Sequence, residues 1–295
     1  MSEDIEIIES AGAFLQQYEG LFCDLWGVVH NGKEPYAGAV ETLQAYRQQG
    51  GYVVLLSNSP RPHDRVADQL REIGVAGDAY DAIVSSGDLT RDAIGAGGSG
   101  GGYGDVFLHI GPSRDEPTFA GLNLIPGDID TAEFMLCTGP YDDTNETPED
   151  YRDLFRVALA RKLPFVCANP DLQVMRGQEV IYCAGALAAL YEEMGGAAVK
   201  LGKPWPMAYE GAHKALNQVA GRTVDPAKVL AIGDGPKTDI QGANNQGLDV
   251  LLVAQGIEAK ALGYRESAPL DATRVTRQLT EWGLSATAAT KGLKP

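Results

Sequence analysis

Residues 51–58, GYVVLLSN, form a continuous apolar and β-branched run, and this run constrains the fold more than any other segment. It predicts a strand that is buried on both faces, as in parallel sheets covered by helices. Helical patterns flank it at residues 38–50 and 59–74. In the second of these helices we expect Ser59 as the N-cap and Pro60 in the first position. The alternation predicts an α/β fold with a doubly wound parallel sheet.

The same alternation of strands and helices resumes in the last third of the chain, whereas the middle third differs. Residues 94–104, IGAGGSGGGYG, are too rich in glycine for the interior of an element and predict a flexible connector or hinge. We therefore expect a core made of residues 1–97 and 196–295, with an α+β unit of residues 98–195 inserted into it. The segment after Trp282 shows no clear pattern and is expected to be frayed.

Composition excludes several classes of partner. The formal net charge is −16, from 24 basic and 40 acidic side chains, which argues against nonspecific attraction to nucleic acid or anionic membranes. The N-terminal MSEDIEIIES does not resemble a signal peptide, and no apolar run reaches the roughly 18 residues of a membrane span. We expect a cytoplasmic protein with no nucleic-acid or membrane partner. The four dispersed cysteines, without a C-x-x-C pair, are expected to be buried thiols.

Polar residues stand where the predicted strands end. Asp24 ends the first buried run, Ser57 and Asn58 end the second, and Asp234 ends a later one, while Lys203 precedes a helix. Ligands of parallel sheets bind beyond the carboxyl ends of the strands, in the crevice where the winding reverses. Each residue alone is more commonly a cap, a turn residue or a surface amine. Together they predict a site with two carboxylates, a hydroxyl and an amine at one sheet edge.

The segments around these residues resemble the motifs of the haloacid dehalogenase-like (HAD) hydrolase superfamily, in particular its class II A branch of NagD-like and phosphoglycolate-phosphatase-like sugar and nucleotide phosphatases. The resemblance covers nearly the whole chain and implies a Rossmann-like core with an inserted cap of the C2 type. The cap segments are CANPDL and GALAAL. The four motif segments, in order, are CDLWGVVHNG (23–32), LLSNSPRP (55–62), LGKPWP (201–206) and IGDGPKTDI (232–240).

The resemblance also implies an activity. It is the Mg²⁺-dependent hydrolysis of a phosphate monoester, a small phosphorylated metabolite, through an aspartyl-phosphate on Asp24. Asp24, the backbone carbonyl of Trp26 and Asp234 would hold Mg²⁺, and Asp239 would complete or orient the metal's ligand shell. The metal would reduce the repulsion between the nucleophile and the phosphate dianion.

Further roles carry over in the same way. Ser57 and the backbone N–H groups near Asn58 and Ser59 would bind phosphoryl oxygens, and Lys203 would balance the charge on the nucleophile and the transferring group. The cap is expected to close over the substrate, and it is a candidate surface for a homodimer.

Trp26 departs from the family's pattern. The family's phosphatases carry at this position an aspartate that protonates the leaving oxygen, and an indole cannot do so. Acid–base catalysis contributes about 10²–10⁴-fold, so its loss would raise the barrier by about 3–5 kcal/mol. His30, or Asp171 of the Asn169-Pro-Asp171 segment, could replace the acid. In this segment Asn169 is a further candidate for contact with the substrate.

Three other interpretations of Trp26 stay open. The substrate could have a leaving group that departs unprotonated, or the protein could be a catalytically weak phosphometabolite-binding protein. L-2-haloacid dehalogenases also carry an aromatic residue here, but they work without magnesium and lack the carboxylate arrangement of the fourth motif. Because Asp234 and Asp239 are both present, metal-dependent phosphoryl chemistry is favoured over a 2-haloacid dehalogenase-like reaction. A purely structural or interaction module remains the rival outside enzymes and binding proteins.

Overall fold

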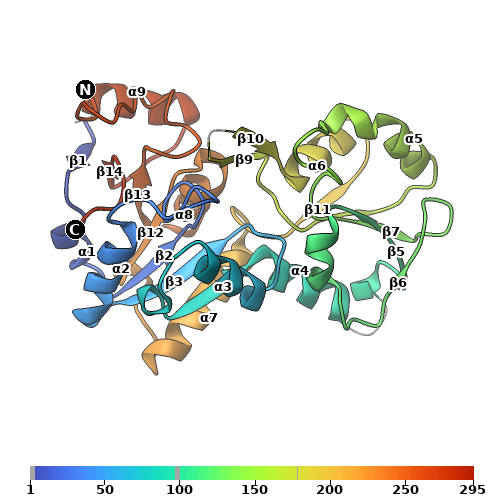
Figure 1. Ribbon diagram of the computed structural model, residues 1–295, viewed down its shortest axis with the longest axis horizontal. Helices are drawn as coiled ribbons and strands as arrows, with labels where there is room; N and C mark the ends of the chain where they lie inside the picture. The colour runs from blue at the N-terminus through green and yellow to red at the C-terminus, as the bar shows by residue number, and fades with distance from the viewer. Residues whose placement is uncertain (1–3, 97–99, 178) are drawn as a thin grey trace.

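The computed structural model describes residues 4–96, 100–177 and 179–295, and two separate sheets organise it (Figure 1). The first is a seven-stranded parallel sheet built from both ends of the chain. Its strands, in spatial order, are β1 (Glu6–Ile8), β14 (Ala288–Thr290), β13 (Asp249–Val253), β12 (Val229–Gly233), β2 (Gly20–Cys23), β3 (Tyr52–Ser57) and β4 (Ala82–Ser85).

Helices cover both faces of this sheet. In β2, Leu21 and Cys23 pack into one hydrophobic cluster and Phe22 packs into the other, because successive side chains of a strand point to opposite faces. The first cluster lies under α1 (Gly12–Leu15), α2 (Ala39–Gln48) and α3 (His63–Glu72). The second lies under α7 (Pro206–Ala220), α8 (Gln241–Gln246) and α9 (Ala272–Trp282). The expected α/β, Rossmann-like doubly wound fold is confirmed.

The direction of winding reverses beside β2. From β2 the chain adds β3 and β4 on one side, and the later strands β12 to β14 continue on the other side. Cys23 of β2 pairs with Ile232 of β12, so the residues that follow these strands lie side by side at the carboxyl edge of the sheet. This is the topological switch point, where open α/β sheets bind their ligands.

The second sheet comes from the middle of the chain and is also parallel. Its spatial order is β11 (Ala198–Lys200), β8 (Phe165–Cys167), β7 (Phe134–Cys137), β5 (Val106–Ile110) and β6 (Ile125–Pro126). One face packs on α5 (Arg152–Ala160) and α6 (Ala184–Glu193). The opposite face contacts Ile94 of α4 (Ser86–Gly95), and a hairpin of β9 (Gln173–Arg176) and β10 (Glu179–Tyr182) lies toward the first sheet (Figure 1).

Three expectations need correction. α3 begins at His63 with Pro62 as its N-cap, not at Ser59, because a residue before proline is kept out of the helical region and Arg61 precedes Pro62. The segment after Trp282 is not frayed, since it contains β14, which pairs with both β1 and β13. β11 pairs with β8, so the second sheet runs to Lys200, beyond the expected boundary at 195.

Several further expectations can be placed on the structure. Of the expected glycine-rich connector, residues 97–99 lie outside the described residues. The four cysteines are free and buried, as expected from their spacing. Across the part of the chain that the structure describes, no helix combines the length and apolar character needed to cross a bilayer.

Candidate active site

Three carboxylates converge at the switch point. Asp24 follows β2, Asp234 follows β12, and Asp239 lies in the turn that leads to α8. Each offers an oxygen within 4.8 Å of the others, and all three are buried. Buried oxygen donors that cluster in this way are the ligands preferred by hard divalent cations. The residues present therefore fit the metal that the sequence implies.

Two glycines leave room for Asp234. A Cβ atom at Gly27 would lie 2.1 Å from Asp234 Oδ2, and one at Gly256 would lie 1.8 Å from the same oxygen. Gly27 also has a φ of +80°, which side chains other than glycine rarely adopt. The backbone N–H of Ile257 donates to Asp234 Oδ2 over 2.6 Å. The loops after β2 and β13 thus fix this carboxylate from both sides.

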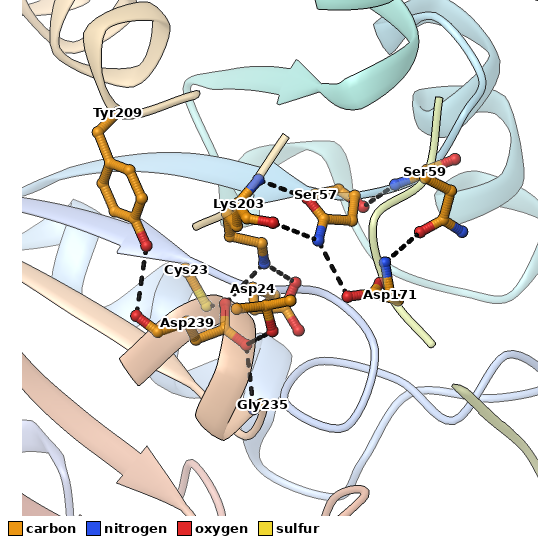
Figure 2. Close-up of polar contacts among 12 residues, drawn as sticks. Cys23, Asp24, Ser57, Ser59, Asp171, Lys203, Tyr209, Gly235 and Asp239 are labelled. Atoms are coloured by element: carbon orange, nitrogen blue, oxygen red, sulfur yellow. Dashed lines mark hydrogen bonds and ion pairs between the residues drawn. The ribbon is translucent and has the colours of Figure 1, made fainter. Parts of the chain in front are cut away.

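Lys203 joins the nucleophile candidate to the third carboxylate. Its Nζ lies 2.5 Å from Asp24 Oδ1 and 2.6 Å from Asp239 Oδ1, and the lysine side chain is only 3% exposed (Figure 2). Asp239 is held in turn by the backbone N–H of Gly235, which donates to Oδ2 over 3.0 Å. One ammonium therefore contacts two of the three carboxylates, and the four groups together carry a formal charge of −2 that a divalent cation would neutralise.

Burial controls the pKa values in this cluster. Burial, followed by the charge of Asp239, raises the pKa of Asp24 to about 8, although Lys203 acts in the opposite direction. Burial and the charge of Asp24 raise the pKa of Asp234 well above its usual range. Burial alone would lower the pKa of Lys203, but the two carboxylates that it contacts outweigh burial and raise it. Another positive charge would favour the ionised carboxylates.

Asn58 links the two halves of the site. Its Oδ1 accepts from the backbone N–H of Lys203 over 2.8 Å, and its Nδ2 donates to the Lys203 carbonyl over 3.2 Å. The same Nδ2 donates to Asp171 Oδ1 over 2.9 Å. Ser57, at the end of β3, is buried and its Oγ accepts from the backbone N–H of Ser59 over 3.1 Å. Asn58 therefore orients both Lys203 and Asp171, a role not expected from the sequence.

Trp26 and His30 pack against each other. Their rings meet edge to face with centroids 5.0 Å apart, and the backbone N–H of Gly32 donates to His30 Nδ1 over 3.0 Å. Burial lowers the pKa of His30 to about 4, and the side chain lines neither of the two large cavities described below. Among the described residues, His30 is thus part of the packing behind Trp26 and is not grouped with the carboxylates.

Asp171 occupies a different position. It comes from the middle third of the chain, directly before the β9–β10 hairpin, and reaches the site through Asn58. Asn169 holds it in place, because Asn169 Oδ1 accepts from the backbone N–H of Asp171 over 3.1 Å. Burial raises the pKa of Asp171 to about 6, with Lys203 acting against the rise. Of the two candidate acids, the structure brings only Asp171 to the site.

Two cavities meet at this point. One of about 640 Å³ contains Asp24, Asp234 and Asp239 in its wall, and the other, of about 380 Å³, contains Ser59 and Asn169. The larger cavity was missed by sequence reasoning because Trp205, Trp282 and residues of the β9–β10 hairpin come together in it from distant segments. Tyr209, whose O–H donates to the Asp239 carbonyl over 3.3 Å, was missed for the same reason.

Comparison with known proteins identifies the family of the chain. A model of haloacid dehalogenase-like hydrolases matches residues 21–119, and a second HAD-hydrolase-like model matches residues 200–282. A solved structure of a haloacid dehalogenase-like hydrolase from Brucella suis 1330 is 40% identical, with a TM-score of 0.85. The match covers 97% of this chain and 99% of that chain.

Two characterised relatives are more distant. D-glycerol 3-phosphate phosphatase from Mycobacterium tuberculosis is 27% identical over 83% of this chain, which spans only 65% of that protein's length. A structure of glycerol phosphate phosphatase from the same organism, in complex with calcium, is 26% identical over 82% of this chain and 68% of that chain, with a TM-score of 0.60. The 5'-nucleotidase YutF of Bacillus subtilis is 25% identical over 91% of this chain and 98% of its own length. By its motifs, its fold and these matches, the chain belongs to the haloacid dehalogenase-like hydrolase family.

Proposed function

We propose that this protein is a Mg²⁺-dependent phosphatase that hydrolyses a small phosphorylated metabolite through an aspartyl-phosphate on Asp24. The observation that carries the proposal is the position of Asp24, which lies at the switch point between the Lys203 ammonium and two further carboxylates. Relatives that are named as a phosphatase and a nucleotidase support this class of substrate.

Asp24, Asp234 and Asp239 would hold the metal, with the backbone carbonyl of Trp26 as a further oxygen ligand. The calcium complex of the related glycerol phosphate phosphatase supports a divalent cation in this family. When bound, such a cation reduces the repulsion between a carboxylate and a phosphate dianion. Lys203 would neutralise part of the same charge, and Ser57 with the backbone of Asn58 and Ser59 would orient the phosphoryl oxygens.

The chemical steps use residues of this chain. One oxygen of Asp24 attacks the phosphorus, the bond between phosphorus and the ester oxygen breaks, and the leaving oxygen takes a proton from Asp171. Water then attacks the phosphorus of the aspartyl-phosphate and returns a proton to Asp171, which releases inorganic phosphate and free Asp24. Covalent catalysis of this kind replaces one difficult displacement with two easier ones.

Asp171 is preferred over His30 as the proton carrier on structural grounds. It lines both cavities and hydrogen bonds to Asn58, whereas His30 is packed behind Trp26. A pKa of about 6 allows a carboxyl to give up and regain a proton near neutral pH. This role makes Trp26 compatible with the hydrolysis of alkyl phosphates.

We further propose that the unit built on the second sheet, residues 98–195 with β11, acts as the cap. Three contacts support its position over the core. Thr118 Oγ1 donates to the Pro60 carbonyl over 2.6 Å, the N–H of Gly177 donates to the Asn31 carbonyl over 2.9 Å, and Asn58 contacts Asp171. A homodimer formed through this unit stays a prediction.

The test is a phosphatase screen with aryl, acyl and alkyl phosphates in the presence of Mg²⁺ and after its removal with a chelator. We expect hydrolysis that requires the metal, and we expect Asp24→Asn to abolish it. Binding of Mg²⁺ and phosphate without turnover would instead identify a phosphometabolite-binding protein. Activity that persists in Asp24→Asn would exclude the covalent intermediate, and hydrolysis of 2-haloacids would favour a dehalogenase.

A further inference from the structure

The cavity of about 380 Å³ lies next to the carboxylate cluster, and the proposed chemical steps use only Asp171 and Ser59 of its wall. Trp26, Asp171 and Val174 line both this cavity and the larger one, so they form a shared wall. The core contributes the loop that follows Ser59 and part of α3, and the middle third of the chain contributes the other walls. A substrate held at Asp24 would therefore have room to extend past Trp26 and Asp171.

Three arginines line this cavity, each with a carboxylate partner, and two of them share the same one. Arg114 and Arg176 both contact the carboxylate of Asp143, with Arg176 Nη2 at 2.6 Å from Asp143 Oδ2. Glu72 lies at the exposed rim. These groups form a polar wall whose charges largely compensate one another.

Arg61 has the most distant carboxylate partner of the three, Asp115, which also lines the cavity. The Arg61 side chain is 22% exposed, and Gln69 is the one side-chain acceptor within hydrogen-bond distance among the described residues. The nearest carboxylate, that of Asp115, is 3.8 Å from Nε, which exceeds the length of a hydrogen bond. Burial lowers the pKa of Arg61, with Asp115 acting against this shift. A guanidinium presents five donors in a fork that matches a carboxylate or phosphate, and Arg61 uses one of them in a side-chain hydrogen bond and faces Asp115 without a direct one.

We propose that the cavity binds a second anionic group of the substrate, carried by the leaving alcohol, and that Arg61 is its main partner. This inference rests on the proposed phosphatase function and narrows its substrates to phosphorylated acids. Arg61 stands two residues after Ser59, so the two anionic groups of one small molecule would be held by the same loop. The volume of the cavity is at the small end of the range for ligand sites, which suits a short organic acid.

The experiment compares 3-phosphoglycerate with glycerol 3-phosphate, which differ in one carboxylate. For the wild type we expect kcat/KM to be about tenfold or more higher for 3-phosphoglycerate, since a hydrogen bond to a charged group supports about 10–100-fold discrimination. Arg61→Met should remove most of this preference, mainly through KM, while p-nitrophenyl phosphate hydrolysis changes less. Arg61→Lys keeps the charge without the fork and should retain part of the preference.

Arg65→Gln is the matched control. This substitution also removes one positive charge, from helix α3, but Arg65 does not line the cavity. It should leave the preference unchanged. Calorimetric titration with glycerate adds a readout without turnover, and Arg61→Met should weaken glycerate binding about tenfold. If no phosphate ester is hydrolysed, the proposed function fails, and the glycerate titration still tests the cavity.

Two results would overturn the inference. One is an equal loss of activity on all three substrates in Arg61→Met, which would show that Arg61 supports the loop and not the anion. The other is a preference for ethanolamine phosphate over 3-phosphoglycerate, which would show that the acidic residues of the cavity dominate and select a cation.

Discussion

The two halves of the active site are built in different ways. The half on the core consists of Asp24, Asp234, Asp239 and Lys203, which are all buried and contact one another at strand ends or in adjacent loops. The other half consists of Asp171 and the arginine-lined cavity. Asp171 contacts Asn58 of the core, and Trp26 separates the cavity from the larger one. Under the proposed mechanism, the core half would determine the reaction, whereas the other half would determine the proton path and the substrate.

Loss of the nucleophile should have the largest effect. Asp24→Asn keeps the size of the side chain but removes the attacking carboxylate, so we expect kcat to fall by at least about 10³-fold on every phosphate ester. Steady-state assays on an aryl and an alkyl phosphate measure this. A loss limited to one of the two substrate classes would contradict the division between the halves.

Gly27→Ala tests the fixed geometry of the core half. The new Cβ would lie 2.1 Å from Asp234 Oδ2, so Asp234 must move, and we expect metal affinity or kcat/KM to fall by about 10–100-fold. Gly50→Ala is the control, because Gly50 also has a positive φ but no atom within 4 Å of its Cβ position. It should cost about 1–2 kcal/mol of stability through backbone strain alone. Titration with Mg²⁺ measures metal affinity, and denaturant unfolding measures stability. Equal metal affinity in Gly27→Ala and Gly50→Ala would contradict the predicted clash with Asp234.

Asp171→Asn tests the proton transfer assigned to the second half of the site. The amide keeps the contact with Asn58 but cannot carry the proton, so hydrolysis of an alkyl phosphate should fall by about 10²-fold. In the first turnover, release of p-nitrophenol should slow by less than about tenfold, because this leaving group departs without protonation, whereas the later hydrolysis of the shared aspartyl-phosphate should slow equally with both substrates. The ratio of the first-turnover rates of leaving-group release for the two substrates, measured across pH, gives the answer. Equal losses would mean that Asp171 positions the site and does not transfer a proton.

Trp26→Asp complements that variant. A carboxyl at this position should speed the hydrolysis of alkyl phosphates more than that of aryl phosphates, by up to about tenfold in a protein that already has Asp171. Expression and thermal unfolding must be compared with the wild type, since Trp26 packs on His30. An equal effect on both substrate classes would show that a missing acid at position 26 does not limit the reaction.

His30 should affect stability and leave the reaction unchanged. Its pKa is lowered to about 4 in the folded state, so the unfolded chain binds the proton more tightly as pH falls. The contribution of His30 to the free energy of unfolding is complete above its unfolded pKa of about 6.5 and is lost as pH falls toward 4. The loss amounts to about 2 kcal/mol between about pH 7 and about pH 5. Urea unfolding of His30→Asn should show a smaller loss over this interval than the wild type.

Sequence patterns predicted the core half because two of its carboxylates directly follow strands that can be recognised from the sequence. Asp24 and Asp234 directly follow apolar strands, and parallel pairing of β2 with β12 brings such residues together without further information. One edge of the sheet was missed, since β1 and β14 are three residues long and are held by pairing with neighbours and not by a strong apolar pattern.

The other half could not be predicted because its contacts join distant segments. Asn58 and Asp171 are 113 residues apart, and Arg61 was not distinguished from a surface arginine until the loops of the middle third enclosed it. From the sequence, His30 and Asp171 were both candidates for the acid. Only tertiary packing separates them, because His30 lies behind Trp26 while Asp171 lines both cavities.

A crystal structure with Mg²⁺ and beryllium trifluoride, a mimic of a phosphoryl group on a carboxylate, tests the central claim most directly. We expect beryllium bonded to a carboxylate oxygen of Asp24, with one Mg²⁺ held by Asp24 and Asp234 and with Lys203 against the fluorides. Binding of the mimic away from Asp24, or a metal that Asp24 and Asp234 do not share, would contradict the account.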